Sequence, residues 1–213
     1  MQIPLAAVIH LLHEAPHAIL STHSTQLPGY PYGTAVPLVV DEAQRPLLLI
    51  SALAEHTKNL LADPRASLAI VEADQANVQD AARATLVGRI EPFQPTPELV
   101  QRYLRYQPDA EQYLQLDFMF FRLHVERLRY IGGIGRMGWL DADAWQAASA
   151  LDAAEESRLL AEAPQNAGSR LLGVDPLGID YEIGGWRRRQ RFANPLSASA
   201  IASQLNALPA SES

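Results

Sequence analysis

Cysteine is absent from the 213-residue chain, and lysine occurs only once, at Lys58, among 17 basic residues. Without cysteine, the chain cannot form disulfide bonds, iron–sulfur clusters or a thiol nucleophile, and a zinc site would need histidine and carboxylate ligands. No hydrophobic run approaches the roughly 18 residues of a membrane-spanning helix, and the N-terminus lacks the basic start of a secretory signal. We therefore expect a cytoplasmic protein without a membrane partner.

Acidic residues outnumber basic ones, which gives a formal net charge of -7. A run of arginines flanked by aromatic residues nevertheless stands at residues 186–192. Because nucleic-acid binding depends on neutralising phosphates, the overall negative charge argues against a nucleic-acid partner. We expect a solvated strand there, with binding of an anionic small ligand as the alternative.

The hydrophobic pattern predicts a β-rich chain with isolated helices. Helices are expected at residues 4–14, after Ser51 and after Thr96, and strands at residues 18–23, 35–40, 47–50, 67–71, 83–91, 118–131 and 139–140. This order favours a small antiparallel barrel over a doubly wound sheet. A helical linker at 142–155 and strands at 169–174, 179–183 and 186–192 predict a small α+β appendage, so the expected domains are residues 1–145 and 146–213.

The segment from His13 to His17 matches H-E-x-x-H, the zinc metalloprotease signature, in its letters. Pro16 lies inside the turn that would have to be helical, and no third ligand is suitably spaced. We therefore expect no metal site, and we interpret His10, His13 and His17 as a solvated polar flank of the first helix.

Three glycines, Gly133, Gly135 and Gly138, match G-x-G-x-x-G after a strand. A dinucleotide site also needs a helix that opens directly on the glycines, and none is predicted here. The pattern favours a backbone bend between strands, with a bend that also contacts a ligand as the alternative.

Residues 50–59 form the strongest candidate binding segment. A predicted strand ends at Ser51 and a helix follows, so Ser51 is expected to be the helix N-cap. The free backbone N–H groups at such a helix start can bind an anion. His56, Thr57, Lys58 and Asn59 add further donors, and the segment is predicted to bind a phosphate.

Residues 47–68 (LLLISALAEHTKNLLADPRASL) resemble the FMN-binding split barrels related to pyridoxamine 5'-phosphate oxidase. Residues 29–37 (GYPYGTAVP), 117–123 and 130–140 (YIGGIGRMGWL) are similar to the branch that contains the HugZ-type haem-utilisation proteins. The likeness spans residues 15–141. Stretches at 173–180 and 191–195 resemble the small C-terminal domain of that branch, which looks shortened in this chain.

The resemblance implies a mainly β fold with flanking helices: a six-stranded antiparallel split β-barrel with a small α+β C-terminal appendage. It also implies a homodimer that binds FMN in clefts at the subunit interface. The implied FMN-binding residues are Tyr32, Thr34 and Val36 beside the flavin, Ser51, His56, Thr57 and Asn59 around its phosphate, Lys58 at the flank, and Arg136 and Trp139 from the same or the partner subunit. His56 takes the relatives' basic position, so His56→Ala is expected to weaken FMN binding more than Lys58→Ala.

The function expected from this resemblance is an FMN-dependent oxidoreductase acting on a small-molecule substrate, without an assigned catalytic residue. The first alternative is a haem-binding protein, with Arg122, Arg136 or the 187–191 run at the propionates and His56 or His124 near the iron. No histidine follows His124, so the C-terminal haem ligand of the branch is absent. The second alternative is a non-catalytic dimeric split barrel.

Overall fold

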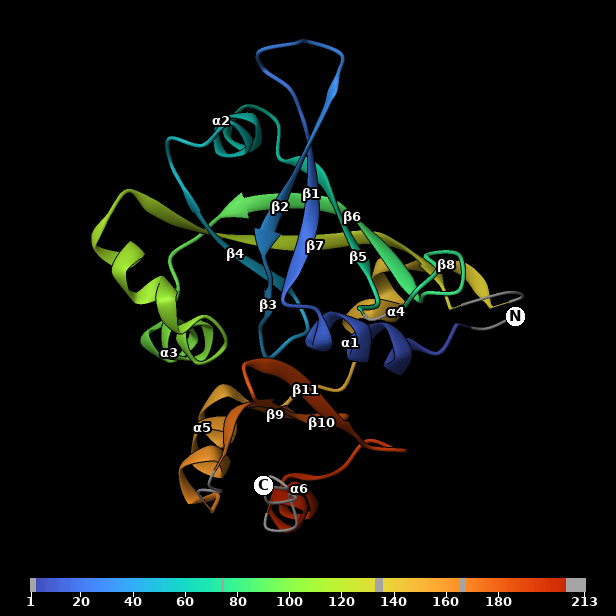
Figure 1. The fold of residues 1–213 in the computed structure, drawn as a ribbon, viewed down its shortest axis with the longest axis vertical. Coiled ribbons are helices and arrows are strands. Elements are labelled where there is room, and N and C mark those ends of the chain that lie inside the picture. The colour runs from blue at the N-terminus through green and yellow to red at the C-terminus, as the bar shows by residue number, and fades with distance from the viewer. Residues whose placement is uncertain (1–2, 74, 133–135, 165–167, 206–213) are drawn as a thin grey trace.

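A computed structural model describes residues 3–205 except 74, 133–135 and 165–167 (Figure 1). An eight-stranded antiparallel sheet dominates the fold, in the order β2-β1-β5-β6-β7-β4-β3, and β8 pairs with β7. Its strands are β1 (His17–His23), β2 (Pro31–Pro37), β3 (Val39–Val40), β4 (Pro46–Ser51), β5 (Arg65–Val71), β6 (Arg83–Pro92), β7 (Phe118–Ile131) and β8 (Met137–Asp141).

The sheet curls around a hydrophobic core, and side chains along its strands are alternately buried in this core and more exposed. In β5 the buried residues are Ala66, Leu68 and Ile70, and the residues between them are more exposed. The longest pairing, between β6 and β7, shifts register next to Gly88, where an added Cβ would lie 2.0 Å from the carbonyl oxygen of His124. This irregularity requires glycine and bends the sheet, as bulges do in barrels.

Five helices or helical turns flank the sheet: α1 (Leu5–Glu14), α2 (Glu55–Ala62), α3 (Pro97–Tyr106), η1 (Pro108–Gln115) and α4 (Ala142–Gln146). Helix α1 packs Val8, Ile9 and Leu12 into the barrel core and ends just before Pro16, as predicted. Thr96 caps α3, because its Oγ1 accepts a hydrogen bond from the Leu99 amide at 3.3 Å.

The remaining part, which we call the C-terminal unit (residues 153–205), is built around a three-stranded sheet. It comprises α5 (Ala153–Glu162), β9 (Ser169–Asp175), β10 (Gly178–Ile183), β11 (Trp186–Arg191) and α6 (Ala198–Leu205), with the strands in the order β11-β10-β9. Its own small core contains Leu159, Ile179 and Ile201. Figure 1 shows the unit below α1 and α3, on the side away from the β1–β2 hairpin.

The predicted fold class is confirmed: the molecule is mainly β, with a curled antiparallel sheet and flanking helices. The sheet has eight strands because the predicted 35–40 strand is divided at Leu38 and β8 joins the edge of β7. The predicted helical linker at 142–155 is wrong, because α4 ends at Gln146 after Trp145 has inserted into the barrel core. The division into domains at residue 145 stays a prediction.

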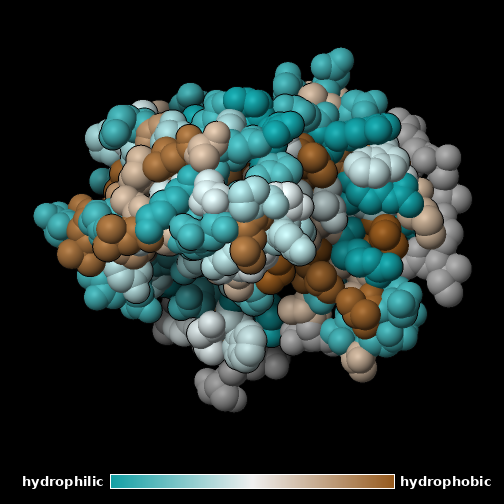
Figure 2. Space-filling model, turned by 90° about the horizontal axis from the view of Figure 1, so that it is seen from above, coloured by the Kyte–Doolittle hydropathy of each residue, from teal (hydrophilic) through white to brown (hydrophobic). Residues whose placement is uncertain are grey.

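The face of the molecule seen in Figure 2 carries hydrophobic residues in separate patches. On the face seen in Figure 2, brown side chains gather at the left end and at the lower right, with hydrophilic residues between them. Among the described residues, no helix has the length and hydrophobicity that crossing a membrane requires.

Candidate functional site

The predicted phosphate-binding segment lies at the end of β4, where Ser51 pairs with Phe118 of β7. The prediction that Ser51 is the N-cap of the following helix is wrong. Helix α2 begins at Glu55, four residues after Ser51, with Ala54 at its N-cap position, and no side chain caps it. The Ser51 hydroxyl instead accepts a hydrogen bond from the Leu53 amide at 3.2 Å and so stabilises the intervening turn.

Two of the predicted phosphate ligands, Thr57 and Asn59, are fully buried. The Thr57 hydroxyl donates to the backbone oxygen of Ser51 at 2.6 Å. The Asn59 amide donates to Thr22 Oγ1 at 3.0 Å, and its Oδ1 accepts from the amide and the hydroxyl of Thr25, both at 2.9 Å. Thr57 thus links α2 to the end of β4, and Asn59 links it to β1. The polar atoms of both side chains are already engaged.

The basic residues of the same helix differ in their surroundings. His56 is half-buried, and burial lowers the pKa of its imidazole. Lys58 is exposed. At neutral pH, Lys58 therefore carries more of the positive charge next to this turn than His56 does.

The second strand places Tyr32, Thr34 and Val36 on one face, since successive strand residues alternate. Tyr32 pairs with Thr22, and Thr22 is hydrogen-bonded to Asn59. The structure therefore brings this end of β2 close to α2, whereas a ligand shared by the two segments stays a prediction. Val36 lies deeper and is buried.

Arg136 and Trp139 lie at the opposite end of the sheet. Trp139 pairs with Arg129 of β7, whereas Ser51 pairs with Phe118. At about 3.3 Å per residue, these two pairs are roughly 35 Å apart along β7. Within one chain, Arg136 and Trp139 therefore cannot meet the same small ligand as Ser51, and only the partner-subunit alternative remains for them.

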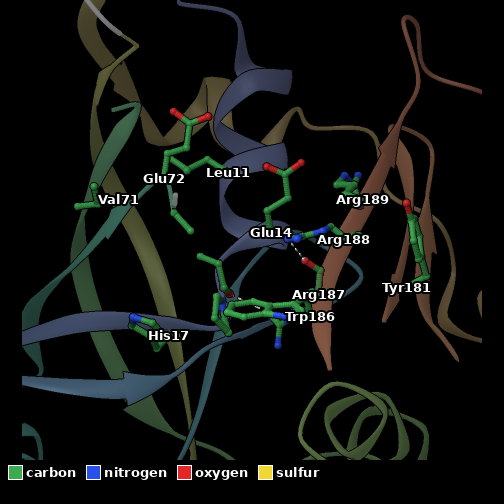
Figure 3. A pocket seen from close by; sticks show the side chains of 13 residues that line it. Leu11, Glu14, His17, Val71, Glu72, Tyr181, Trp186, Arg187, Arg188 and Arg189 are labelled. Carbon is green, nitrogen blue, oxygen red and sulfur yellow. Dashed lines mark hydrogen bonds between the residues drawn. The ribbon is translucent and has the colours of Figure 1, made fainter. Parts of the chain in front are cut away.

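A pocket of about 400 Å³ lies between the barrel and the C-terminal unit, and we call it the seam pocket (Figure 3). From the barrel, Glu14, His17 and Glu72 line it, with Leu11, Ala15, Pro16 and Val71 as the apolar part. From the C-terminal unit come Tyr181, Trp186, Arg187, Arg188 and Arg189. Figure 3 shows His17 on one side and Tyr181 on the other, with Trp186 and Arg187 between them.

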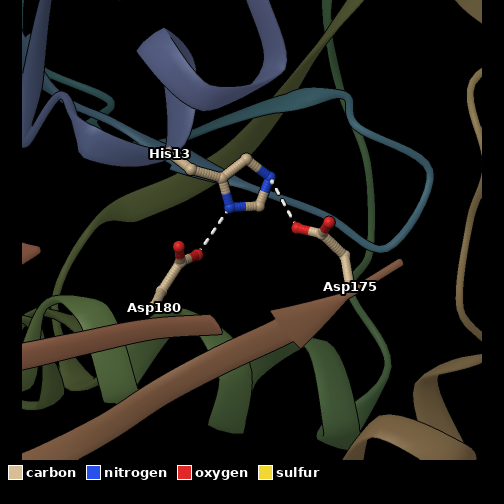
Figure 4. A group of neighbouring side chains, drawn as sticks. All are labelled: His13, Asp175 and Asp180. Carbon is tan, nitrogen blue, oxygen red and sulfur yellow. Dashed lines mark hydrogen bonds and ion pairs between the residues drawn. The ribbon is translucent and has the colours of Figure 1, made fainter. Parts of the chain in front are cut away.

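A buried ionic cluster joins the C-terminal unit to helix α1 of the barrel (Figure 4). It adjoins the seam pocket, because Arg189 belongs to both. Asp180 Oδ2 lies 2.5 Å from His13 Nδ1, and Asp175 Oδ2 lies 3.4 Å from His13 Nε2. Arg189 donates to Asp180 at 2.6 Å and to both oxygens of Asp175 at 2.8 Å. Burial raises the pKa of Asp180, but Arg189, His13 and Tyr106 together outweigh this effect and hold that pKa well below its usual range.

His13, Asp175 and Asp180 could also be seen as metal ligands, since their ligand atoms lie within 4.8 Å of one another. Arg189, however, already supplies a positive charge to both carboxylates. The cluster is therefore explained as an ion-pair network without a metal. His10 extends it, because its Nδ1 accepts a hydrogen bond from Arg189 Nε at 3.0 Å.

These contacts correct two predictions. His10 and His13 are buried rather than a solvated flank, because the C-terminal unit covers that side of α1, and only His17 is exposed. The arginine run is not simply a solvated strand, because the Arg189 side chain is completely buried. The rejection of a zinc metalloprotease motif agrees with the structure, since α1 ends at Glu14 before His17. Of the G-x-G-x-x-G glycines, Gly133 and Gly135 lie outside the described residues.

Arg122, another residue considered for propionates, is also engaged: its Nε lies 3.2 Å from Asp41 Oδ2, and its guanidinium lies over the Phe93 ring at 3.9 Å. His124 is exposed on β7. The seam pocket, the His13 cluster and the carboxylates Asp175 and Asp180 were not predicted as a site.

Sequence comparison finds a relative in Arabidopsis thaliana, the chloroplastic non-canonical heme oxygenase HOZ. It is 33% identical over 133 residues, which cover 62% of this chain and 41% of the relative. The chain thus spans less than half of that relative's length.

Solved structures match over nearly the whole chain. The heme binding protein from Mycobacterium smegmatis is 25% identical, with a TM-score of 0.63, and the match covers 98% of this chain and 100% of that chain. The Agrobacterium tumefaciens protein Atu2129, of unknown function, is 23% identical with a TM-score of 0.73, covering 95% and 93%. The second likeness shows the fold alone.

The expected membership of the split-barrel superfamily is confirmed, whereas the HugZ-type branch stays a prediction. Residues 7–147, which contain the whole eight-stranded sheet, match the family model for the CREG β-barrel. The protein therefore belongs to the CREG β-barrel family.

Proposed function

We propose that this protein binds haem. The observation that carries the proposal is the match to the Mycobacterium smegmatis heme binding protein, which includes both the barrel and the C-terminal unit. The 33% identity with a heme oxygenase supports the same ligand. The proposal is for binding, because the relative with oxygenase activity in its name is much longer than this chain.

The side chains present fit such a ligand better than a flavin phosphate. Three histidines, His17, His23 and His124, are exposed and could approach an iron atom, whereas His10 and His13 are buried and engaged. Thr57 and Asn59, by contrast, use their polar atoms within the chain. Haem supplies its own iron chemistry when bound, so the protein's part is to hold and orient it.

A haem titration tests the proposal. Purified protein should shift the Soret band of added haem with saturable stoichiometry and should melt at a higher temperature, because a ligand that binds only the folded state stabilises it. A Soret band that stays at the position of free haem, without any change in melting temperature, would contradict the proposal.

FMN is the second candidate, as cofactor of an oxidoreductase acting on a small molecule. The observation in its favour is that α2, which carries the exposed Lys58, is linked to the strand pair that contains Tyr32. The link is the hydrogen bond from Asn59 of α2 to Thr22, which pairs with Tyr32. The same melting experiment with FMN separates the two ligands, since a flavoprotein would be stabilised by FMN and would show a flavin absorbance band.

We further propose a homodimer formed through the outer face of the sheet. A row of paired residues crosses five strands, from β1 to β8, and consists of Ile19, Ala69, Thr85, Arg129 and Trp139. Ile19 is 44% exposed and Trp139 is 49% exposed, which leaves apolar area that a second copy would cover. Val87→Arg, on this face, should give monomers in light-scattering measurements, and an unchanged mass would contradict this interface.

A further inference from the structure

We infer that the seam pocket is the haem site of this protein, with His17 as the iron ligand and Arg187 and Arg188 holding the carboxylates. This inference rests on the proposed function and names the site for it. The pocket is formed by segments that are far apart in the sequence, because His17 begins β1 whereas the two arginines lie on β11.

Arg187 places a positive charge at the pocket without a carboxylate in contact. Its guanidinium donates to the backbone oxygens of Ala15 at 2.7 Å and Leu38 at 3.2 Å and lies over the Tyr106 ring at 4.9 Å. Within the described part of the chain, it forms no ion pair with a carboxylate. Asp180 and Glu182 favour its charge only from a distance. A cation largely withdrawn from water without a carboxylate in contact is costly, so an anionic ligand would be stabilised there.

The other charged side chains at the pocket differ in whether they have a partner. Arg189 and its neighbour on the same face, Arg191, are neutralised by Asp175, Asp180 and Glu14. Arg188 is exposed, and among the described residues its guanidinium has no acidic partner. Glu72 already accepts a hydrogen bond from the Ala82 amide at 3.0 Å. Three arginines and two carboxylates line the pocket itself, and Arg187 and Arg188 are the two of these arginines that have no carboxylate in contact among the described residues.

The side chains that line the pocket include an aromatic ring and an imidazole. Trp186 is 62% exposed and offers a flat ring, with the Arg188 guanidinium 5.9 Å from its centre. The His17 side chain is exposed, and in the ranges that the structure covers it makes no hydrogen bond, so its ring nitrogens are free. A volume of about 400 Å³ lies within the usual range of small-molecule sites. An imidazole, an aromatic ring and two unpaired arginines suit a flat, anionic, iron-containing ligand.

Two matched pairs of variants test this site. His17→Ala is compared with His23→Ala, because both histidines are exposed on β1 but only His17 lines the pocket. Arg188→Glu is compared with Arg89→Glu, because Arg89 is exposed on β6 and does not line the pocket. All four residues are exposed, so the variants should keep the wild-type melting temperature without ligand.

The readout is a haem titration followed in the Soret region. We expect His17→Ala to change the position of the bound Soret band and to weaken haem binding by at least about tenfold, since even residues behind a metal ligand have effects of that size. Arg188→Glu should weaken binding while leaving the band position unchanged. His23→Ala and Arg89→Glu should bind like the wild type.

Failure of the site and failure of the proposed function give different results. If the wild type binds haem and the two pocket variants bind it equally well, the seam pocket is not the site although haem binding stands. If the wild type does not bind haem, the proposed function is wrong and the site is overturned with it as a haem site. Iron-free protoporphyrin IX, which has the carboxylates without the metal, adds a second readout. It should quench tryptophan fluorescence by a larger fraction in the wild type than in Trp186→Phe, because Trp139 and Trp145 remain in the variant. An equal fractional quenching in both would contradict the pocket.

Discussion

The barrel interior and the contact between α1 and the C-terminal unit, which we call the seam, are equally buried but are stabilised by different interactions. Leu20, Leu68 and Phe121 in the barrel are fully buried and apolar. At the seam, the equally buried groups are Asp180 and its partner Arg189. A barrel contact should weaken gradually as volume is removed, whereas the seam depends on every partner being present and on pH.

The largest expected effect is the loss of the cation at the seam. Arg189→Met leaves Asp175 and Asp180 buried without their shared positive charge, which should lower the free energy of unfolding by about 3–5 kcal/mol. Urea denaturation measures the change. Arg158→Met is the matched control, because Arg158 pairs with Glu155 and Glu162 on the surface and should matter much less. Equal effects of the two variants would show that the seam is not a buried ionic contact.

The corresponding change in the barrel is Leu68→Ala. Leu68 is fully buried in β5, so the truncation should cost about 2–5 kcal/mol from lost burial and the cavity it leaves. Since no titrating group is involved, the loss should be the same at pH 5 and pH 7 in urea denaturation. A loss that varies strongly with pH would remove the distinction between the two regions.

The pH dependence of the seam comes in part from His10. Burial, followed by the charge of Arg189, lowers the pKa of His10 to about 4. Because the unfolded chain binds a proton on this residue more readily than the folded one, the stabilisation is complete above about pH 6.5 and is lost as the pH falls towards 4. The full shift corresponds to roughly 3 kcal/mol.

His10→Asn tests this assignment, because the amide oxygen can still accept the hydrogen bond from Arg189 while the side chain no longer titrates. Unfolding free energies of the variant should therefore change less between pH 7 and pH 5 than those of the wild type. Parallel pH profiles of the two proteins would contradict the assignment of this dependence to His10.

The smallest expected effect concerns FMN. His56 was expected to be the main cation, but its lowered pKa makes it a weaker one at neutral pH. Lys58→Ala should therefore reduce FMN affinity more than His56→Ala when the protein is titrated at pH 7.5. The reverse ranking would favour the role that the family resemblance gives to His56.

The sequence predicted elements well where the controlling contacts are local. Hydrophobic spacing placed the helix that ends before Pro16, and the Thr96 cap has its expected partner three residues later. Strand alternation likewise identified the long β7. In each case the periodicity of one segment is enough to determine its structure.

The seam could not be predicted in the same way. His13 meets Asp180 across 167 residues, and His10 meets Arg189 across 179 residues. Periodicity identifies the two faces of α1, but it does not show that a later unit will cover the polar one. One signal was present: in a strand with several consecutive arginines, alternate side chains share a face, so docking the strand must bury some of them.

Absorbance titration of the purified protein with haem tests the central claim most directly. We expect a saturable shift of the Soret band in the wild type. The position of the bound band should change in His17→Ala and should equal that of the wild type in His23→Ala. A wild-type spectrum identical to that of free haem would contradict haem binding, and a His17→Ala spectrum identical to the wild type would contradict the seam pocket as its site.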